Sequence, residues 1–532
     1  MLLGKKLSSK NLDHQLLPKT VALPIFSSDP LSSVAYGPQE LLMILTLGGI
    51  GLLSMAPGIA ALVVLLLTVI VLSYRKVIKA YPSGGGDYEV AMKNLGKKPA
   101  LIVASALLLD YVMTVAVSIA SGTDNLISAF PELNPWRVEI AVAFVVFLLA
   151  VNLRGVRESG VAFAVPTYLF ITSVFVMIGT GFYKFLTGQP LVAYSAGFEV
   201  TPLDQVENTM NAALILLVLR AFASGCSALT GIEAIANGVP AFRKPKVKNA
   251  QTTMTLMGLT AVLMFIGVTA LALISKVHYA ENPCEQLPDW TACATDPQMS
   301  VMAQIGGAVF GYNNWMFYVI QAGTAAVLLL AANTAFNGFP LLSSVLAQDK
   351  FAPKALLTRG DRLVYSNGML SLSAAALILI IAYQASVTGL IQLYIIGVFV
   401  SFTLGQTGMV VHWTKLLKTN PDNRGSIIRS RLINITGATF TAAVLVIVTI
   451  TKFSHGAWIV FVAMPILYTL MIGVNRYYRD VEAEVAVDAV TTFGAKGDHA
   501  IVLVGKMQKH VLKALKAEPV TFYKTRPSTT AA

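Results

Sequence analysis

Long apolar stretches alternate with shorter polar segments along most of this chain. About twelve of these stretches have roughly the 20 residues that an α-helix needs to cross the hydrocarbon core of a bilayer. The pattern therefore predicts an all-α membrane protein with about 12 transmembrane helices. We expect these spans at approximately residues 21–46, 51–74, 100–128, 138–153, 160–183, 210–238, 252–275, 310–338, 367–384, 387–411, 433–451 and 456–475.

Polar residues interrupt two of these spans. The first span reads "VALPIFSSDPLSSVAYGPQELLMIL" (residues 21–45) and has serines, prolines and Asp29 between its two apolar ends. The sixth reads "RAFASGCSALTGIEAIANG" (residues 220–238) and has small and polar residues at its centre, followed by Glu233. Close helix packing explains the small residues of the sixth span. It does not explain a carboxylate in either span.

Both interruptions carry a cost in lipid. An ionised carboxylate at the bilayer centre costs about 2.5–3.5 kcal/mol. Backbone that leaves the helix is tolerated only where protein or a water-filled cavity surrounds it. Pro30 lacks an N–H group and disfavours helical geometry at the preceding residue, so we expect Asp29 outside the helical conformation. Both costs are met if the two breaks face each other around a binding site.

The positions of the breaks also predict a topology. Broken spans at positions one and six are typical of an inverted repeat of five plus five helices. Spans 1–5 would then form one half, spans 6–10 the other half, and spans 11 and 12 would be additional. The two halves show no residue-level similarity, so this prediction depends on the matching breaks.

Composition and charge agree with a membrane protein. The chain is 55% hydrophobic and 12% charged, with a mean hydropathy of +0.68, which leaves too few polar residues to cover a soluble core. With the N-terminus inside, the predicted cytoplasmic segments before the last span contain 25 Lys and Arg residues, and the outer loops contain only Arg137, Lys184, Lys276 and Lys452. This bias predicts cytoplasmic N- and C-termini. It explains most of the net charge of +12, so we do not expect nucleic acid as a partner.

The chain divides into three predicted regions. Residues 1–20 form a cytoplasmic tail, residues 21–477 the transmembrane transporter domain, and residues 478–532 a short cytoplasmic segment. In the last region, "HAIVLVGKM" predicts a strand and "KHVLKALKAE" a helix. One strand and one helix cannot form an independent core. This segment therefore either pairs with its copy in a homodimer or is vestigial.

Two of the three cysteines, Cys284 and Cys293, share one predicted outer loop. An extracytoplasmic environment preserves disulfides. The two residues are either bonded to each other or are two free surface thiols, and we expect a structural disulfide.

Three motifs closely resemble the bacterial potassium-uptake transporters of the KUP group, which lies within the amino acid–polyamine–organocation superfamily. The motifs are "IFSSDPLSSVAYGPQE", "LDYVMTVAVSIASG" and "SGCSALTGIEAIANGVPAF", and the resemblance covers roughly residues 10–480. It implies the LeuT-type fold and proton-coupled potassium import. Family members carry a larger cytoplasmic C-terminal domain, so this chain looks shortened. The family's potassium-binding positions match Asp29, Tyr36, Asp110, Tyr111, Thr114, Ser118, Thr230, Glu233 and Tyr394.

These residue types suit a hard monovalent cation, which prefers oxygen ligands in place of its water shell. Asp110, Thr114 and Ser118 are spaced four apart and so share one helix face. Histidine is absent from the set and Cys226 is a single thiol, which argues against a transition-metal site. Each residue also has a structural alternative: Asp110 pairing within the bundle, the tyrosines packing, and the hydroxyls bonding to their own helix. Arg220 is a candidate structural ion-pair partner for Asp29 or Glu233.

The predicted function is secondary active transport that imports potassium by proton symport across the bacterial plasma membrane. The transported potassium and protons are the expected ligands, and we expect no cofactor. We assign the proton mainly to Glu233, because it follows the break on re-formed helix toward the cytoplasm. Asp29 is the alternative proton carrier.

The main alternative is a proton-coupled amino-acid or amine permease of the same fold. Amino-acid permeases typically have a glycine-rich first break whose N–H groups bind the substrate carboxylate. The sequence here is "SSDPLSS", and a fixed aspartate repels a carboxylate and attracts a cation. An organic amine or polyamine therefore remains open as the substrate.

Two other classes are disfavoured. A potassium channel would need a "TVGYG"-like filter, which the chain lacks. An enzyme would need a nucleophile–base pair or a phosphate loop, and the glycine-rich turn "SGGGD" (83–87) lacks the lysine and the helix context of a nucleotide loop. We therefore do not expect an enzyme.

Overall fold

The computed structural model describes residues 16–84, 86–154, 160–202, 212–293, 295–360, 364–419, 424–453 and 456–485. In these segments the chain is helical and has no strand. The α-helices are α1 (Lys19–Ser32), α2 (Gly37–Thr46), α3 (Ala56–Ala80), α4 (Gly86–Asn94), α5 (Lys97–Ala129), α6 (Arg137–Leu153), α7 (Gly160–Leu186), α9 (Ala212–Gly225), α10 (Glu233–Asn237), α11 (Lys246–Ile274), α12 (Pro283–Gln286), α13 (Val301–Phe310), α14 (Trp315–Gln348), α15 (Ser366–Ala382), α16 (Val387–Thr419), α17 (Arg424–Lys452) and α18 (Trp458–Glu484). Short 3-10 turns include η2 (Ser33–Ala35), η6 (Cys226–Leu229) and η7 (Val239–Ala241).

Ten helices in the described part of the chain are long and apolar enough to cross a membrane, so this is a multi-pass membrane protein. Each of the ten overlaps a predicted span. The first predicted span is divided between α1 and α2, which have 14 and 10 residues. The ninth predicted span is α15, with 17 residues. The total of twelve and the inverted repeat stay predictions, as do the predictions for the C-terminal segment, because residues 486–532 lie outside the described residues.

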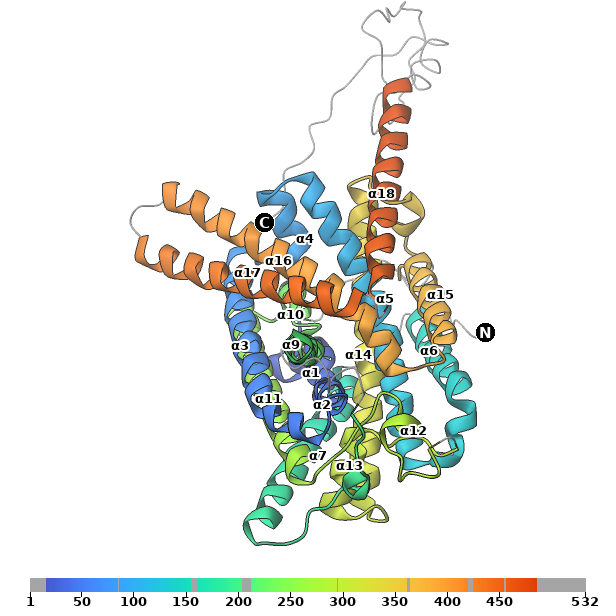
Figure 1. The fold of residues 1–532 in the computed structure, drawn as a ribbon. Coiled ribbons are helices and arrows are strands. Elements are labelled where there is room, and N and C mark those ends of the chain that lie inside the picture. The colour runs from blue at the N-terminus through green and yellow to red at the C-terminus, as the bar shows by residue number, and fades with distance from the viewer. Residues whose placement is uncertain are drawn as a thin grey trace, which may run out of the picture.

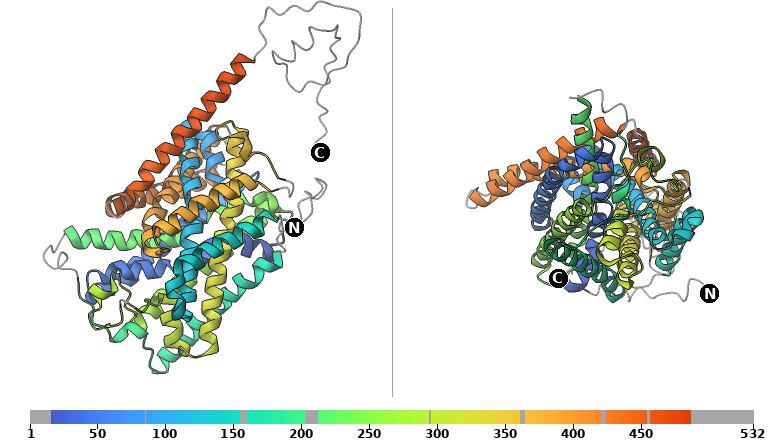
Figure 2. Two further views of the ribbon diagram at one scale, coloured as in Figure 1. Left: turned by 90° about the vertical axis from the view of Figure 1, so that its right-hand side faces the viewer. Right: turned by 60° about the horizontal axis from the view of Figure 1, so that its bottom comes forward.

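The centre of the bundle is built on α5, which packs against α14 and α16. Most of α5 is buried, and alanine, serine and threonine make up much of its buried surface. Such small side chains allow neighbouring helices to approach closely: a Cβ atom at Gly397 of α16 would lie 3.1 Å from the carbonyl oxygen of Ala106. In contrast, α18 lies at the edge of the bundle and extends beyond it (Figures 1 and 2).

The first break lies one helical turn later than the sequence indicated. Asp29 and Pro30 remain inside α1, and the α-helix gives way to the 3-10 turn only at Ser33. The expectation that Asp29 leaves the helical conformation is therefore wrong. The carbonyl oxygen of Asp29 accepts hydrogen bonds from the hydroxyl groups of Ser32 and Ser33, both at 2.9 Å. These bonds stabilise the end of α1 beyond the proline.

The second break is longer. After η6, Thr230 is extended and Gly231 has a φ of +74°. Helical geometry resumes with Glu233, the first residue of α10. Glu233 is thus on re-formed helix just past the break, as predicted.

The two breaks lie against each other in the middle of the bundle, between α3 and α11 on one side and α5 and α14 on the other (Figure 1). The hydroxyl groups of Ser33 and Thr230 are 2.9 Å apart. A Cβ atom at Gly231 would lie 2.3 Å from Oδ2 of Asp29. Helix α1 also contacts the chain after α10, since the rings of Phe26 in α1 and Phe242 stack at 5.5 Å. The prediction that the breaks face each other is confirmed.

Gly231→Ala should destabilise the protein and abolish its transport. A left-handed conformation costs a residue with a Cβ atom roughly 1–2 kcal/mol, and the new methyl group would also overlap the Asp29 carboxylate. Thermal unfolding of the detergent-solubilised protein should show a lower melting temperature. The matched control is Gly425→Ala, in α17, where an added Cβ meets nothing within 4 Å. An unchanged melting temperature in Gly231→Ala would contradict the close approach of the two breaks.

Candidate cation-binding site

Three carboxyl groups lie together where the breaks meet. Asp29 comes from α1, Asp110 from α5 and Glu233 from the start of α10, and their exposed fractions are 4%, 3% and 3%. Asp110 interacts electrostatically with both of the others, and Glu233 with Asp29. None of the three forms a salt bridge with a lysine or arginine in the described segments. The centre of the bundle therefore holds three acidic groups without a basic side chain from the described segments to balance them.

Several oxygen atoms of these carboxyl groups, and of serines on α1, α5 and η6, are buried and have no hydrogen-bond partner. They are Asp29 Oδ1, Asp110 Oδ1, Glu233 Oε2 and the hydroxyl groups of Ser27, Ser28, Ser118 and Ser227. Buried polar atoms in folded proteins are nearly always paired, because an unpaired one costs free energy. A set of unpaired oxygens beside unbalanced carboxylates is what a bound monovalent cation would satisfy.

Hydroxyl groups connect the two breaks directly. The Ser33 hydroxyl lies 2.7 Å from that of Tyr36 and 2.9 Å from that of Thr230, while Tyr36 and Thr230 are 3.4 Å apart. Thr230 also donates to the carbonyl oxygen of Ser227 at 3.2 Å. Sequence reasoning missed Ser33. Its position four residues after Asp29, on the same face of a helix, was the available signal.

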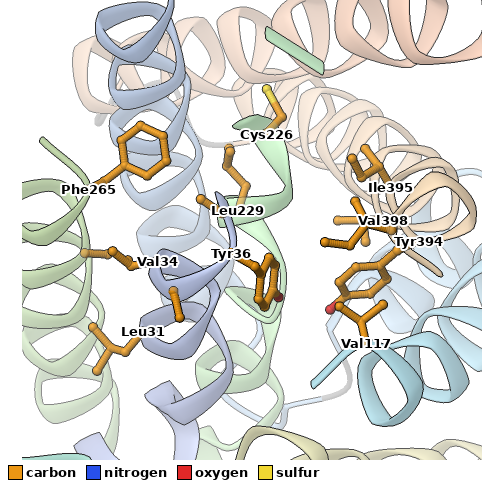
Figure 3. Packing of buried hydrophobic residues seen from close by; sticks show 14 of the residues in the cluster. Leu31, Val34, Tyr36, Val117, Cys226, Leu229, Phe265, Tyr394, Ile395 and Val398 are labelled. Carbon is orange, nitrogen blue, oxygen red and sulfur yellow. The ribbon is translucent and has the colours of Figure 1, made fainter. Parts of the chain in front are cut away.

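A second hydroxyl pair connects α5 to α16. The hydroxyl groups of Thr114 and Tyr394 are 2.9 Å apart, so Thr114 bonds across the bundle and not to its own helix. Figure 3 shows the rings of Tyr36 and Tyr394 on opposite sides with their hydroxyl groups turned toward each other. Tyr394 also interacts electrostatically with Asp29 and Asp110. Residues from the first, third, sixth and tenth predicted spans therefore meet at one place.

Tyr111 has a different environment. Its ring packs against α14, where a Cβ atom at Gly338 would lie 2.5 Å from the ring. Its side chain is only partly buried. Tyr111 also interacts electrostatically with Asp29, Asp110 and Glu233, and its place among the ligands stays a prediction.

Comparison with known proteins identifies the family and relatives of this chain. The sequence profile of the amino acid permease family matches residues 31–473. The potassium transporter KimA of Bacillus subtilis is 40% identical over 517 residues, which cover 97% of this chain and 80% of KimA. The low-affinity putrescine importer PlaP of Escherichia coli is 24% identical over 306 residues, or 56% of this chain and 59% of PlaP.

The chain belongs to the amino acid permease family. The resemblance to potassium-uptake transporters that the three motifs indicated is confirmed by the match to KimA. The family is one of transporters, which is consistent with the expectation that this chain is not an enzyme.

A second cluster of charged residues lies beside the site, and sequence reasoning did not find it. Glu40 of α2 and Lys452 of α17 both have an exposed fraction of 0% and interact electrostatically. Lys452 was assigned to an outer loop, but it is the last residue of α17 and is buried. Glu40 is one helical turn after Tyr36 and also accepts a hydrogen bond from Thr388 of α16 at 3.4 Å.

Arg220 belongs to this second cluster. It forms a salt bridge with Glu281 at 3.3 Å, not with Asp29 or Glu233, so the expectation of a pair with a site acid is wrong. The reason is its position in α9, more than one turn before the break. Consequently Arg220 does not balance the charge of the three site carboxyls.

The structure joins Cys284 to Cys293 by a disulfide. The bond closes the loop around Trp290, whose ring packs with Phe198 at 5.9 Å. This cluster is separate from the site. Cys226 is a free, buried thiol at the start of η6.

Glu40→Gln should destabilise the protein strongly, because it leaves Lys452 as a buried cation that has lost its main opposite charge. Removing one member of a buried pair typically costs about 3–5 kcal/mol, whereas replacing both members is often nearly neutral. The double variant Glu40→Gln/Lys452→Met should therefore melt at a higher temperature than Glu40→Gln alone. Additive losses in this double-mutant cycle would show that the two residues do not interact.

Proposed function

We propose that this protein is a secondary active transporter that imports potassium by proton symport across the bacterial plasma membrane. The observation that carries the proposal is the cluster of three buried carboxyls with unpaired oxygens around it and no basic partner in the described segments. The name of its relative KimA, a potassium transporter, supports the same ion.

The site chemistry favours a cation over an amino acid. A substrate carboxylate would face Asp29, Asp110 and Glu233 at short range, and like charges in a low-dielectric interior repel strongly. An amine is compatible with these acids, and PlaP is a putrescine importer. We favour potassium because the similarity to KimA is higher and extends over nearly the whole chain.

Two broken helices that meet at the centre of the bundle suit alternating access. In transporters with inverted repeats, the substrate binds near the bilayer midplane between discontinuous helices, and one group of helices moves against the other. We propose the LeuT-type five-plus-five repeat for this chain on that basis. With cytoplasmic termini, the end of the bundle that includes α4 faces the cytoplasm. Import of a cation is then assisted by the membrane potential, by about 2.3 kcal/mol per charge per 100 mV.

The three carboxyls also provide a means of coupling. Like charges this close cannot all remain ionised without a counter-ion. A bound potassium ion balances one charge, and a proton on one carboxyl balances another. We assign potassium mainly to Asp29, because its neighbours Ser33, Tyr36 and Thr230 offer further oxygens. We assign the proton mainly to Glu233.

Expression of this protein should restore growth of a potassium-uptake-deficient bacterial strain at low potassium.

Asp29→Asn should lower the potassium affinity at least about tenfold, because a carboxylate beside a cation contributes several kcal/mol even at an effective dielectric constant of about 20. Thr230→Val should also weaken binding, since it removes one oxygen at similar volume. Cys226→Ala is the control and should leave the affinity unchanged.

Potassium affinity is measured on the purified protein, and uptake on the cells. Unchanged affinity in Asp29→Asn would remove that residue from the site. Failure of rescue despite confirmed membrane expression, together with uptake of an amine, would instead favour the amine permease.

Glu233→Gln is a permanently neutral mimic of the protonated carboxyl. It should still bind potassium but lose accumulation driven by a pH gradient, measured in liposomes with an imposed gradient. If Glu233→Gln retains pH-driven uptake while Asp29→Asn or Asp110→Asn loses it, the proton belongs to that other acid.

A further inference from the structure

A fourth buried carboxyl lies toward the predicted cytoplasmic end of the bundle. Asp87 is in the first turn of α4, and its exposed fraction is 1%. Its Oδ2 atom accepts hydrogen bonds from the Tyr74 hydroxyl of α3 at 2.7 Å and from the Ser401 hydroxyl of α16 at 2.9 Å. Its Oδ1 atom is buried and has no partner. The carboxyl therefore connects three elements and still has one oxygen free to take a proton.

The glycines around Asp87 explain how the carboxyl reaches this position. Gly84 and Gly86 have φ values of +79° and +50°, which L side chains rarely adopt. A Cβ atom on either would lie within 2.7 Å of Asn237, the last residue of α10. On the other side, a Cβ atom at Gly405 of α16 would lie 2.2 Å from Asp87 Oδ1. Gly84, Gly86 and Gly405 thus allow Asp87 to pack tightly between α16 and the short helix that begins with Glu233.

Electrostatic interactions connect Asp87 to the site. Glu233 interacts with Asp87 as well as with Asp29. The Tyr74 hydroxyl, which donates to Asp87, interacts with Glu233 and Asp110. Glu233 is therefore within electrostatic range of both Asp29 and Asp87, and Tyr74 lies beside Asp87.

We propose that Asp87 accepts the transported proton after Glu233 and releases it to the cytoplasm. In this step the Glu233 carboxyl loses a proton and becomes a carboxylate, while the Asp87 carboxylate gains that proton and later gives it to water. No electrons are transferred. The proposal rests on the proposed proton symport and assigns the inner end of its proton path.

The acid strength of Asp87 suits the release of a proton to the cytoplasm. Burial raises the pKa of the Asp87 carboxyl to about 6, against the lowering effect of its hydrogen bonds from Tyr74 and Ser401. The groups that face it are these two hydroxyls from α3 and α16, Glu233 from α10, and Tyr111 from α5. Near neutral pH such a group is mostly ionised and can accept a proton. Below about pH 6 it stays protonated, so an acidic internal solution should inhibit proton release.

Asp87→Asn is the first test, because an amide oxygen can still accept both hydroxyl hydrogen bonds but the side chain cannot carry the proton. Potassium affinity of the purified variant should equal that of the wild type. Accumulation in liposomes with an imposed pH gradient should fall at least about tenfold, as expected on removal of a proton-transfer group. The matched control is Asp349→Asn, which also removes a carboxyl that accepts a tyrosine hydroxyl, from Tyr88 at 2.8 Å. It should accumulate potassium normally.

Tyr74→Phe provides a second test, the internal pH that half-inhibits uptake. This pH would not change if Asp87 had a purely structural role. It removes a hydrogen bond that favours the ionised form of Asp87, so the pKa of Asp87 should rise further. The internal pH that half-inhibits uptake should then shift upward by about half a unit or more. The phenylalanine ring can still pack against Phe402, whose ring centroid is 5.5 Å from that of Tyr74 in the wild type. This measurement decides the question if Asp87→Asn does not fold.

Folded Asp87→Asn with wild-type pH-driven accumulation would overturn the proposal, as would an unchanged half-inhibiting pH in Tyr74→Phe. These outcomes leave the symport proposal intact, because the wild type would still couple potassium to protons. If the wild type itself showed no pH-driven uptake, the symport proposal would fail and the role of Asp87 would fail with it.

Discussion

Buried negative charge without a basic partner is the constraint on which the rest of this structure depends. Asp29, Asp110 and Glu233 lie together where water is excluded, and no described lysine or arginine forms a salt bridge with them. A structure that keeps such a cluster must hold its backbone firmly, because repulsion favours separation of the three helices. The hydrogen bonds of Ser33 with Tyr36 and Thr230 join the two breaks, and the small side chains of α5 let α14 and α16 close around them.

The charged groups differ in kind along the bundle. One turn from Tyr36, the cluster of Glu40, Lys452, Arg220 and Glu281 contains two acids and two bases, so its charges balance internally. It connects both broken helices to α17. The charged groups of the site itself are all acids, and the next charged group toward the cytoplasm, Asp87, is also an acid. A cation at the site would therefore neutralise charge that the neighbouring balanced cluster does not have, which is a simple electrostatic reason for it to bind there.

The sequence predicts most of the fold, because membrane spans depend on length and apolar composition alone. The ten long helices overlap ten predicted spans, and Asp29 and Glu233 were found as acids that lipid would not tolerate. The break itself was misplaced by a turn, since the effect of Pro30 was considered without the hydroxyls of Ser32 and Ser33 that stabilise the helix end. Lys452 was placed in an outer loop because it lies between the predicted spans 433–451 and 456–475. Its partner Glu40 is far away in the sequence, and only the fold brings them together. Asp87 was overlooked for a similar reason: a glycine-rich turn is normally exposed, and the packing of this one against Asn237 appears only in three dimensions.

The central claim is that a monovalent cation binds between the two helix breaks. The most direct measurement is a structure of the protein determined with rubidium in place of potassium, using the anomalous scattering of rubidium to locate the ion. We expect a peak in contact with the carboxylate of Asp29 and the hydroxyl of Thr230. A protein that accumulates rubidium but shows peaks only elsewhere would contradict this account.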